Sequence, residues 1–372
     1  MHNFKSFLLP FLCLFIAGCT SEPPSGSDAE VVELDDFETI IQIDDGVLST
    51  PNIIRYEDSS FFVYDAAQGM VLELDNDGAI VKEYGRQGRG PGELLTVNNL
   101  YLTVEHLYIV DPWQFMIHKY ERGRDFIESM NYVSRTSQPN APPAPISSTT
   151  ILASDFDNQP FVTLSGDVML SAVQFEDTVE TIYELRAWNG DKRSGIGEVP
   201  EGSSFLIDNE QMKSDVTDRV IPSLYRPKAF PVNDPANPEE YFLVYSAFPR
   251  IAKYNSSGQK LWEKEVRVVA ETDEYKAAFF EQMERLQQND IRNRIPLQHY
   301  KAGISSAEGD LFLISEFQDL WIHQFNPAGD LIRRYKLISD EDVKLKPIFD
   351  IDFSGRRVFV VTEEAEVRAY TF

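Results

Sequence analysis

The sequence predicts an all-β fold, a six-bladed β-propeller closed by strands from both ends of the chain and carrying one inserted amphipathic helix. Two observations lead to this prediction. A unit of strand, hairpin, strand, hairpin and strand recurs along the chain. The chain also ends with three strands where a blade needs four, and it begins with a strand that has no hairpin partner.

The clearest copy of the repeat runs from Phe61 to Gly92. An apolar run ends at Asp65, an alternating run closes on Leu74, and the turn 75–78 (DNDG) leads to a third strand that ends at Tyr84. An apolar or aromatic residue that closes the third strand of each blade serves as a marker for the count. The markers are Leu74, Tyr120, Trp188, Tyr254, Phe325 and Tyr370.

The intervals between markers match the size of a blade. Leu74 to Tyr120 is 46 residues and Phe325 to Tyr370 is 45 residues, close to the roughly 40–50 residues of a four-stranded blade. The three longer intervals each hold an insertion. Six markers therefore predict six blades.

Residues 1–18 are predicted to be a lipoprotein signal peptide. Phe7 to Ala17 is apolar and too short to span a bilayer. Ile16-Ala17-Gly18-Cys19 resembles a bacterial lipobox, and in such signals the cysteine carries the lipid. This resemblance implies lipid attachment at Cys19 and an anchor in the cell envelope. The alternative is an ordinary secretory signal, which also exports the chain.

Residues 19–30 are predicted to be a flexible tether, and 31–372 the propeller. The tether is made of Pro, Ser, Gly and acidic residues and cannot bury surface. The only cysteines are Cys13 and Cys19. The propeller therefore has no disulfide, no cysteine nucleophile and no cysteine metal site.

The two ends of the chain are expected to pair. Val31 to Ile43 reads as one long strand or a strand pair, and the last strands are expected at 348–353, 357–362 and 367–372. The first strand can supply the fourth strand of the last blade, which would remove the exposed edges of the ring.

Three insertions interrupt the repeats. Residues 134–150 and 200–238 are rich in proline and are expected to be loops, the second with at most a short helix. The insertion at about 271–290 has apolar residues at steps of three and four and predicts an amphipathic helix over 271–289. The helix either covers an apolar patch of the propeller, which is favoured, or forms a lid over the channel mouth.

Residues 84–93 (YGRQGRGPGE) carry a family resemblance. They are similar to the G-x-x-G-x-G-P-G-E junction of six-bladed β-propeller lipoproteins of Bacteroidetes-like bacteria, which are distant relatives of NHL-repeat propellers. The motif occurs once, after the first blade, unlike the repeated NHL pattern. The resemblance implies the fold and an envelope location, and it transfers no catalytic residues.

The same glycine-rich run has two interpretations. The structural one is a tight junction between two blades, made possible by glycine. The functional one is an anion site in which Arg86, Arg89 and backbone amides face a carboxylate or phosphate. It is not a P-loop, because no Gly-Lys-Ser/Thr follows.

The formal net charge is −26. So acidic a chain lacks the basic patches that nucleic acid requires, and no nucleic-acid partner is expected. The expected partners are the membrane, through the lipid on Cys19, and an envelope protein, peptide or glycan.

No cofactor is clearly predicted. Asp65, Asp111, Glu316 and Glu363 end or follow second strands, and such a ring of carboxylates could hold calcium. Ser171 and Ser246 interrupt the ring. His118 and His323 occupy matching positions in separate blades, which is a poor arrangement for one metal.

Two functions stay open. The favoured one is a binding or scaffold module, with Arg55, Arg226, His299 and Tyr300 as candidate ligand contacts near inner strands. The alternative is a metal-dependent hydrolase or lyase with its site in the central channel, similar to gluconolactonase-like propellers. That enzyme needs at least three convergent carboxylate, Asn or His side chains, and the sequence shows no such set.

Overall fold

The computed structural model describes residues 29–42, 46–132, 159–172, 179–205, 208–266, 269–289, 295–340 and 343–372. The predicted signal peptide, Cys19, the predicted tether up to residue 28 and the predicted loop 134–150 lie outside the described residues. Within the described part of the chain, neither helix has the length and apolar character needed to cross a bilayer.

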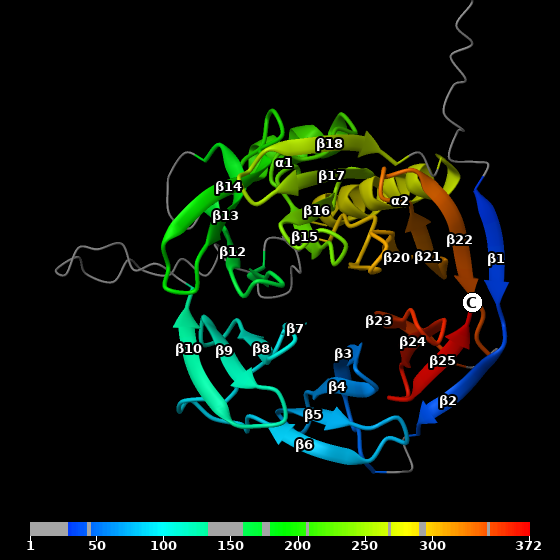
Figure 1. Cartoon of the computed structure of the whole chain (residues 1–372). Coiled ribbons are helices and arrows are strands. Elements are labelled where there is room, and N and C mark those ends of the chain that lie inside the picture. Colours follow the sequence, from blue (N-terminus) through cyan, green and yellow to red (C-terminus); the bar gives the residue numbers. More distant parts are fainter. Residues whose placement is uncertain are drawn as a thin grey trace, which may run out of the picture.

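Six β-sheets stand around a central axis (Figure 1), so the predicted six-bladed propeller is confirmed. Blade 1 contains β3 (Pro51–Glu57), β4 (Ser60–Asp65), β5 (Met70–Leu74) and β6 (Ile80–Tyr84). Blade 2 contains β7 (Asn99–Leu102), β8 (His106–Asp111), β9 (Met116–Glu121) and β10 (Phe126–Asn131). Blade 3 contains β11 (Phe161–Val162), β12 (Val168–Ser171), β13 (Thr181–Arg186) and β14 (Lys192–Glu198).

The second half of the ring follows the same order. Blade 4 contains β15 (Ala229–Asn233), β16 (Glu240–Tyr245), β17 (Arg250–Asn255) and β18 (Lys260–Glu265). Blade 5 contains β19 (Ala302–Ser305), β20 (Leu311–Phe317), β21 (Asp319–Phe325) and β22 (Leu331–Leu337). Blade 6 contains β23 (Leu345–Asp352), β24 (Arg357–Thr362) and β25 (Val367–Thr371).

Strand composition follows position in the blade. The second strands β4, β8 and β16 are almost wholly buried, because other blades cover both faces, and they read as continuous apolar runs. The outermost strand β18 alternates between exposed and half-buried side chains. One apolar cluster fills each of the six interfaces between neighbouring blades, so each blade is stabilised by burial against its two neighbours.

The hairpin between the third and fourth strands repeats in the first five blades. At each one the register shifts by a bulge. A glycine with positive φ occupies each turn, a conformation that other residues rarely adopt. These glycines are Gly78, Gly123, Gly190, Gly258 and Gly329. They are the turns from which the sequence predicted the repeat.

One marker was misplaced. Trp188 does not close a strand, because β13 ends at Arg186 and Trp188 lies in the following turn. Its ring instead packs on Tyr108 of blade 2, with centroids 5.4 Å apart. The blade count is unaffected.

The N-terminal segment closes the ring, as expected, and it does so as two strands, one of the two alternatives that the sequence left open. β2 (Phe37–Ile41) pairs antiparallel with β25 and is the outer strand of blade 6. β1 (Glu30–Leu34) pairs parallel with β22 and adds a fifth strand to blade 5. The first and last inner strands, β3 and β23, lie side by side (Figure 1).

Two helices interrupt the strands. α1 (Asn209–Thr217) lies between blades 3 and 4, and α2 (Val269–Gln288) lies between blades 4 and 5. The helix predicted at 271–289 is therefore confirmed, and α1 is the short helix allowed in the 200–238 insertion. Figure 1 shows α2 to one side of the central axis, over blades 4 and 5.

We predict that pairing of the N-terminal strand stabilises the whole ring. Ile41 on β2 is 1% exposed and packs in the cluster between blades 6 and 1. Ile41→Ala should lower the free energy of unfolding in urea by about 2–5 kcal/mol. Val31→Ala on β1, where the side chain is 52% exposed, should change it by less than about 0.5 kcal/mol. Equal effects of the two variants would contradict closure by β2.

Candidate functional site

The long connections of the propeller all emerge on one face. In an antiparallel meander of four strands, the turn between the second and third strands and the link to the next blade lie at the same end. α1, α2 and the glycine-rich junction all belong to links between blades. We call this end of the propeller the helix-bearing face.

The two helices form a small core of their own. Phe279, Phe280 and Met283 of α2 are buried against Met212 and Val216 of α1. The same cluster includes Ala247, in the turn after the second strand of blade 4, together with Tyr225 and Leu297. Asp208 caps α1 by accepting hydrogen bonds from the amides of Glu210 and Gln211. α2 therefore covers an apolar patch, which agrees with the favoured interpretation of this helix.

A hollow of about 500 Å³ lies beside this helical core. Its described lining contains Pro200, Glu201, Arg219, Val220, Ile221, Arg226, Phe248, Arg250 and Lys276. Four of these nine side chains are cationic, in a protein whose net charge is −26. We call this site the cationic hollow.

Arg226 is held in place by main-chain oxygens. Its Nε donates to the Ile221 carbonyl at 2.9 Å, and its Nη1 donates to the Glu201 carbonyl at 2.9 Å. A Cβ at Gly202 would lie 2.3 Å from the same Nη1, so glycine leaves the room in which the guanidinium sits. Among the described residues no carboxylate lies within 4 Å of Arg226. Its position is therefore fixed without neutralisation of its charge.

The other three cations come from three separate elements. Arg250, at the start of β17, stacks on Tyr245 and Phe248 at 5.1 and 5.0 Å and lies 3.6 Å from Glu263. Arg219, after α1, lies 3.6 Å from Glu284. Lys276 projects from α2, and no carboxylate of the described residues lies within 4 Å of its ammonium. The sequence analysis missed these three residues, because no pattern links positions on two insertions and a strand.

His299 and Tyr300 line a second, smaller hollow, which also borders α2. Its volume of about 30 Å³ is that of one water molecule, and Thr272 and Tyr275 of α2 form one wall. Burial lowers the pKa of His299 to about 4, helped by the nearby Lys276 ammonium, so the ring is neutral at pH 7. α2 thus borders both hollows, with Thr272 and Tyr275 at this one and Lys276 at the cationic one.

Tyr300 is buried and paired with a histidine of the same blade. Its hydroxyl lies 2.9 Å from Nδ1 of His323, which is 4% exposed. Burial lowers the pKa of His323 to about 3. Nε2 of His323, like Nε2 of His118 in blade 2, has no hydrogen-bond partner among the described residues. The structure therefore places Arg226 in one hollow and His299 and Tyr300 in another, with α2 bordering both.

Arg55 lies apart from these residues, on the inner strand of blade 1. Its Nε donates to the Leu100 carbonyl at 3.2 Å, and its Nη2 donates to Asn99 Oδ1 at 2.9 Å. Both acceptors are on β7, the inner strand of blade 2. The guanidinium therefore connects two blades beside the central axis.

Similar polar ties join other neighbouring inner strands. Tyr101 donates to the Pro160 carbonyl at 3.0 Å, which links blades 2 and 3. Asn233 of blade 4 donates to the Val162 carbonyl of blade 3 at 3.2 Å, and the Ser305 hydroxyl of blade 5 donates to the Asn233 carbonyl. The polar groups around the axis are thus used to hold the blades together.

Asp350 makes the tie between the last blade and the first. It is 2% exposed on β23 and accepts hydrogen bonds from the amides of Tyr56 at 2.9 Å and Ile351 at 2.7 Å. Burial raises the pKa of Asp350 to about 6, although Arg55 and the two amides act in the opposite direction. The closure of the ring therefore contains a carboxyl group whose charge is disfavoured.

The glycine-rich junction connects β6 to β7, and it holds a carboxylate from its own sequence. Arg86 lies 2.6 Å from Glu93 Oε1, and the Gly90 amide donates to Glu93 Oε2 at 2.7 Å. These hydrogen bonds lower the pKa of Glu93. A Cβ at Gly88 would lie 2.0 Å from Glu93 Oε2, which explains the glycine there. Arg89 is exposed.

Two of the carboxylates proposed as a calcium ring, Asp65 and Asp111, accept hydrogen bonds from nearby backbone amides. Asp65 accepts hydrogen bonds from the amides of Ser49, Thr50, Ala67 and Gln68, and is fully buried. Asp111 is bound in the same way in blade 2 by Leu95, Trp113 and Gln114. Within the described ranges, no group of three or more His, Cys, Asp or Glu side chains could hold a metal ion. Calcium binding stays a prediction.

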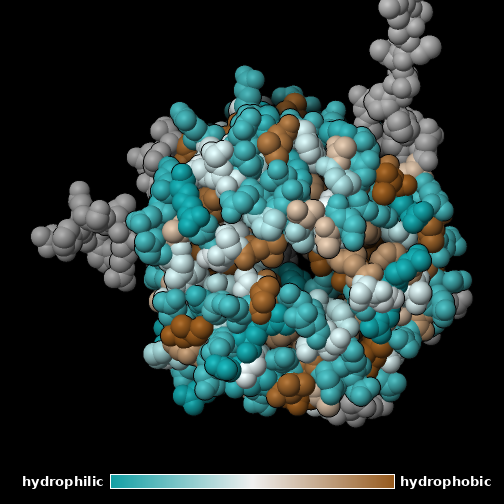
Figure 2. Space-filling model, in the orientation of Figure 1, coloured by the Kyte–Doolittle hydropathy of each residue, from teal (hydrophilic) through white to brown (hydrophobic). Residues whose placement is uncertain are grey.

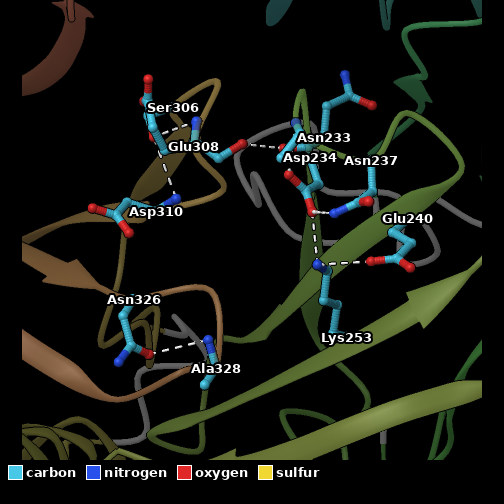
Figure 3. Close-up of polar contacts among 12 residues, drawn as sticks. Asn233, Asp234, Asn237, Glu240, Lys253, Ser306, Glu308, Asp310, Asn326 and Ala328 are labelled. Atoms are coloured by element: carbon cyan, nitrogen blue, oxygen red, sulfur yellow. Dashed lines mark hydrogen bonds and ion pairs between the residues drawn. The ribbon is translucent and has the colours of Figure 1, made fainter.

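A further polar cluster lies at the turns of blades 4 and 5 (Figure 3). Lys253 is 5% exposed, and its ammonium lies 2.7 Å from Asp234 and 2.8 Å from Glu240. The nearby Ser306 hydroxyl accepts hydrogen bonds from the amides of Glu308 and Asp310. These groups satisfy one another within the turns of blades 4 and 5, so they have an architectural role.

The rest of the surface offers no large apolar site in the view shown. Figure 2 shows a mostly hydrophilic face with small separate hydrophobic groups around an opening at the centre. The exposed large hydrophobic residues of the described chain are spread over many elements, including β1, β6, β10, β18 and β22. The cationic hollow is therefore the strongest candidate for a ligand site.

Comparison with known proteins supports the fold. No protein-family model matches the sequence, and no curated protein matches it either. A solved structure from Bacteroides fragilis, described as an exported protein, is 12% identical with a TM-score of 0.53, and the match covers 92% of this chain and 98% of that one. At this identity the likeness is evidence for the fold alone.

Two further solved structures show weaker likeness. A member of the DUF4221 family from Bacteroides vulgatus is 8% identical with a TM-score of 0.46, covering 92% of this chain and 95% of that one. A streptogramin B lyase is 12% identical with a TM-score of 0.44, covering 91% and 87%.

We predict that two aspartates of β23 have opposite pH dependences. Because Asp350 binds its proton more tightly in the fold, stability should fall as the pH rises from about 4 to 6. Asp350→Asn should remove up to about 3 kcal/mol of that fall. The pKa of Asp352 is lowered, since its bonds to Gly355, Ser354 and Arg357 outweigh burial. Asp352→Asn should therefore be less stable than the wild type near neutral pH, and this difference should shrink as the pH falls. Urea unfolding from pH 2 to 8 tests both, because the pKa of Asp352 lies below its ordinary value of 3.8, and slopes of the same sign would contradict the assignment.

We also predict that the junction glycine and Glu93 are energetically coupled. Gly88→Ala should lower the free energy of unfolding by about 1–3 kcal/mol, because the new methyl group meets the Glu93 carboxylate. Glu93→Ala should be destabilising by itself through loss of its hydrogen bonds. The double variant should be more stable than the sum of the two effects by about 1 kcal/mol, measured in a double-mutant cycle. Simple additivity would show that the methyl group clashes elsewhere.

Proposed function

We propose that this chain is an exported binding propeller, tethered to the envelope membrane by a lipid on Cys19, and that it binds a glycan, peptide or envelope protein. An acidic group of the ligand enters the cationic hollow on the helix-bearing face. The observation that carries the proposal is the convergence of Arg219, Arg226, Arg250 and Lys276 on one hollow of about 500 Å³. This volume is within the range of small-molecule sites.

Electrostatics support a specific site rather than general adsorption. The net charge of −26 repels anions from most of the surface. Two of the four cations, Arg226 and Lys276, have no carboxylate within 4 Å among the described residues. An acidic ligand group would therefore gain charge-assisted hydrogen bonds in this hollow and would find few such partners elsewhere.

The location is supported by the N-terminus. Ile16-Ala17-Gly18-Cys19 resembles a lipobox, and a structural neighbour is described as exported. The tether then leads into β1, at the outer edge of blade 5.

We expect Lys276→Gln to weaken binding of acidic ligands selectively. Binding of matched acidic and neutral oligosaccharides and peptides to the purified protein can be measured by calorimetry. The acidic members should lose about fivefold to tenfold in affinity, because one charge-assisted contact is lost, and neutral members should not change. Added salt should reduce the difference.

Lys213→Gln serves as the matched control. Lys213 is an exposed lysine of α1 on the same face. Its replacement by glutamine therefore removes the same charge at a position outside the hollow. If both variants weaken binding equally, the effect is one of overall charge and the hollow is not the site. Metal bound to the purified protein, with activity on lactones lost on chelation, would favour the channel-centred hydrolase or lyase instead.

A further inference from the structure

The charges and side chains that line the cationic hollow indicate which class of acidic ligand it binds. This inference rests on the proposed function. The charges in and around the hollow can be counted. Four cations, Arg219, Arg226, Arg250 and Lys276, line it. Three carboxylates are close to them: Glu201 in the lining, Glu263 beside Arg250 and Glu284 beside Arg219. Glu263 also lies 3.3 Å from Lys260, which is outside the lining. Among the four lining cations and the carboxylates nearest to them, one positive charge is left in excess.

An excess of one charge suits a monoanion. A carboxylate carries a single negative charge at pH 7, whereas a phosphate monoester carries about −1.5 to −2. A dianion would overcompensate the hollow and would also meet the repulsion of a strongly acidic protein. The charge balance therefore favours a carboxylate.

Arg226 has the geometry to bind that carboxylate. A guanidinium has five N–H donors in a planar fork, and the structure assigns two of them to the Ile221 and Glu201 carbonyls. Three donors are left in a side chain whose orientation is already fixed, so little entropy is lost when a ligand binds. A planar fork held this way matches the two oxygens of a carboxylate.

The remaining lining is apolar. Pro200, Val220, Ile221 and Phe248 are the other described lining residues, and Val220 is 43% exposed. The described lining contains no Ser, Thr, Asn, Gln or Tyr side chain, which are the neutral groups suited to sugar hydroxyls. The hollow therefore offers an aliphatic surface beside the cationic fork.

We infer that the cationic hollow binds the free C-terminal carboxylate of a peptide that ends in an aliphatic residue, with Arg226 holding the carboxylate and Val220 and Ile221 packing on the aliphatic side chain. Arg226 is then the specificity-determining residue. Lys276 and Arg250 supply further positive charge, and Gly202 maintains the position of the Arg226 guanidinium.

Small probes test each part of this inference on the purified protein. N-acetylvaline should shift NMR signals of the protein saturably. N-acetylvalinamide, which lacks the charge, should bind at least about tenfold more weakly. N-acetylglycine, which lacks the aliphatic group, should bind several-fold more weakly. Glucuronic acid and inorganic phosphate should both bind more weakly than N-acetylvaline.

Variants distinguish the planar geometry of the Arg226 guanidinium from its charge. Arg226→Lys keeps the charge and loses the planar fork, so it should weaken N-acetylvaline about tenfold while the loss for phosphate is smaller. Gly202→Ala should also weaken binding, because its methyl group displaces the guanidinium. Lys276→Gln provides a binding-deficient variant in which the ties of Arg226 are intact. Melting temperatures show whether each variant is folded.

The outcomes distinguish this inference from the proposed function. If glucuronic acid or phosphate binds the hollow more tightly than N-acetylvaline, and Lys276→Gln weakens that binding about fivefold to tenfold, the peptide inference is overturned while the proposed acidic-ligand site stands. If N-acetylvaline and its amide bind equally, the carboxylate plays no part and the inference fails. If no probe distinguishes wild type from Lys276→Gln, both proposals fail.

Discussion

Closure of the ring is the constraint on which the rest of this structure depends. Each blade buries its apolar faces only against its two neighbours, so an open ring would expose two of those faces and two strand edges. The chain meets the constraint by pairing β2 with β25 and β1 with β22. The polar ties around the axis, from Arg55 to Asp350, join the inner strands on the same principle.

Closure also limits where ligand recognition can develop. Around the axis, many of the polar groups are engaged between blades, and Asp350 is buried with its oxygens bonded to amides. The links between blades are free to lengthen, because they lie outside the packed sheets. α1 and α2 arise in two such links, and they bring together cations that come from separate insertions and from β17. The candidate site is thus a product of the insertions on a rigid frame.

The glycine-rich junction has the composition of an anion-binding motif, but the anion that it holds is part of its own sequence. Four glycines, two arginines and exposed amides are suited to an anion, and the structure does show an anion among them. It is the carboxylate of Glu93, which belongs to the motif itself. The motif thereby maintains the link between β6 and β7, and the arginine that the sequence analysis selected as a ligand contact supports the turn.

The sequence by itself determined the six blades, the hairpin glycines, closure from both ends and the position of α2, because each depends on local periodicity and turn chemistry that a short window contains. Trp188 was misplaced where a turn moved an aromatic residue just past its strand. Only the tertiary structure decided that Arg226 and Lys276 share one hollow while His299 and Tyr300 lie elsewhere. Their meeting depends on how two insertions pack on blade 4, and no sequence period relates residues so far apart in the chain.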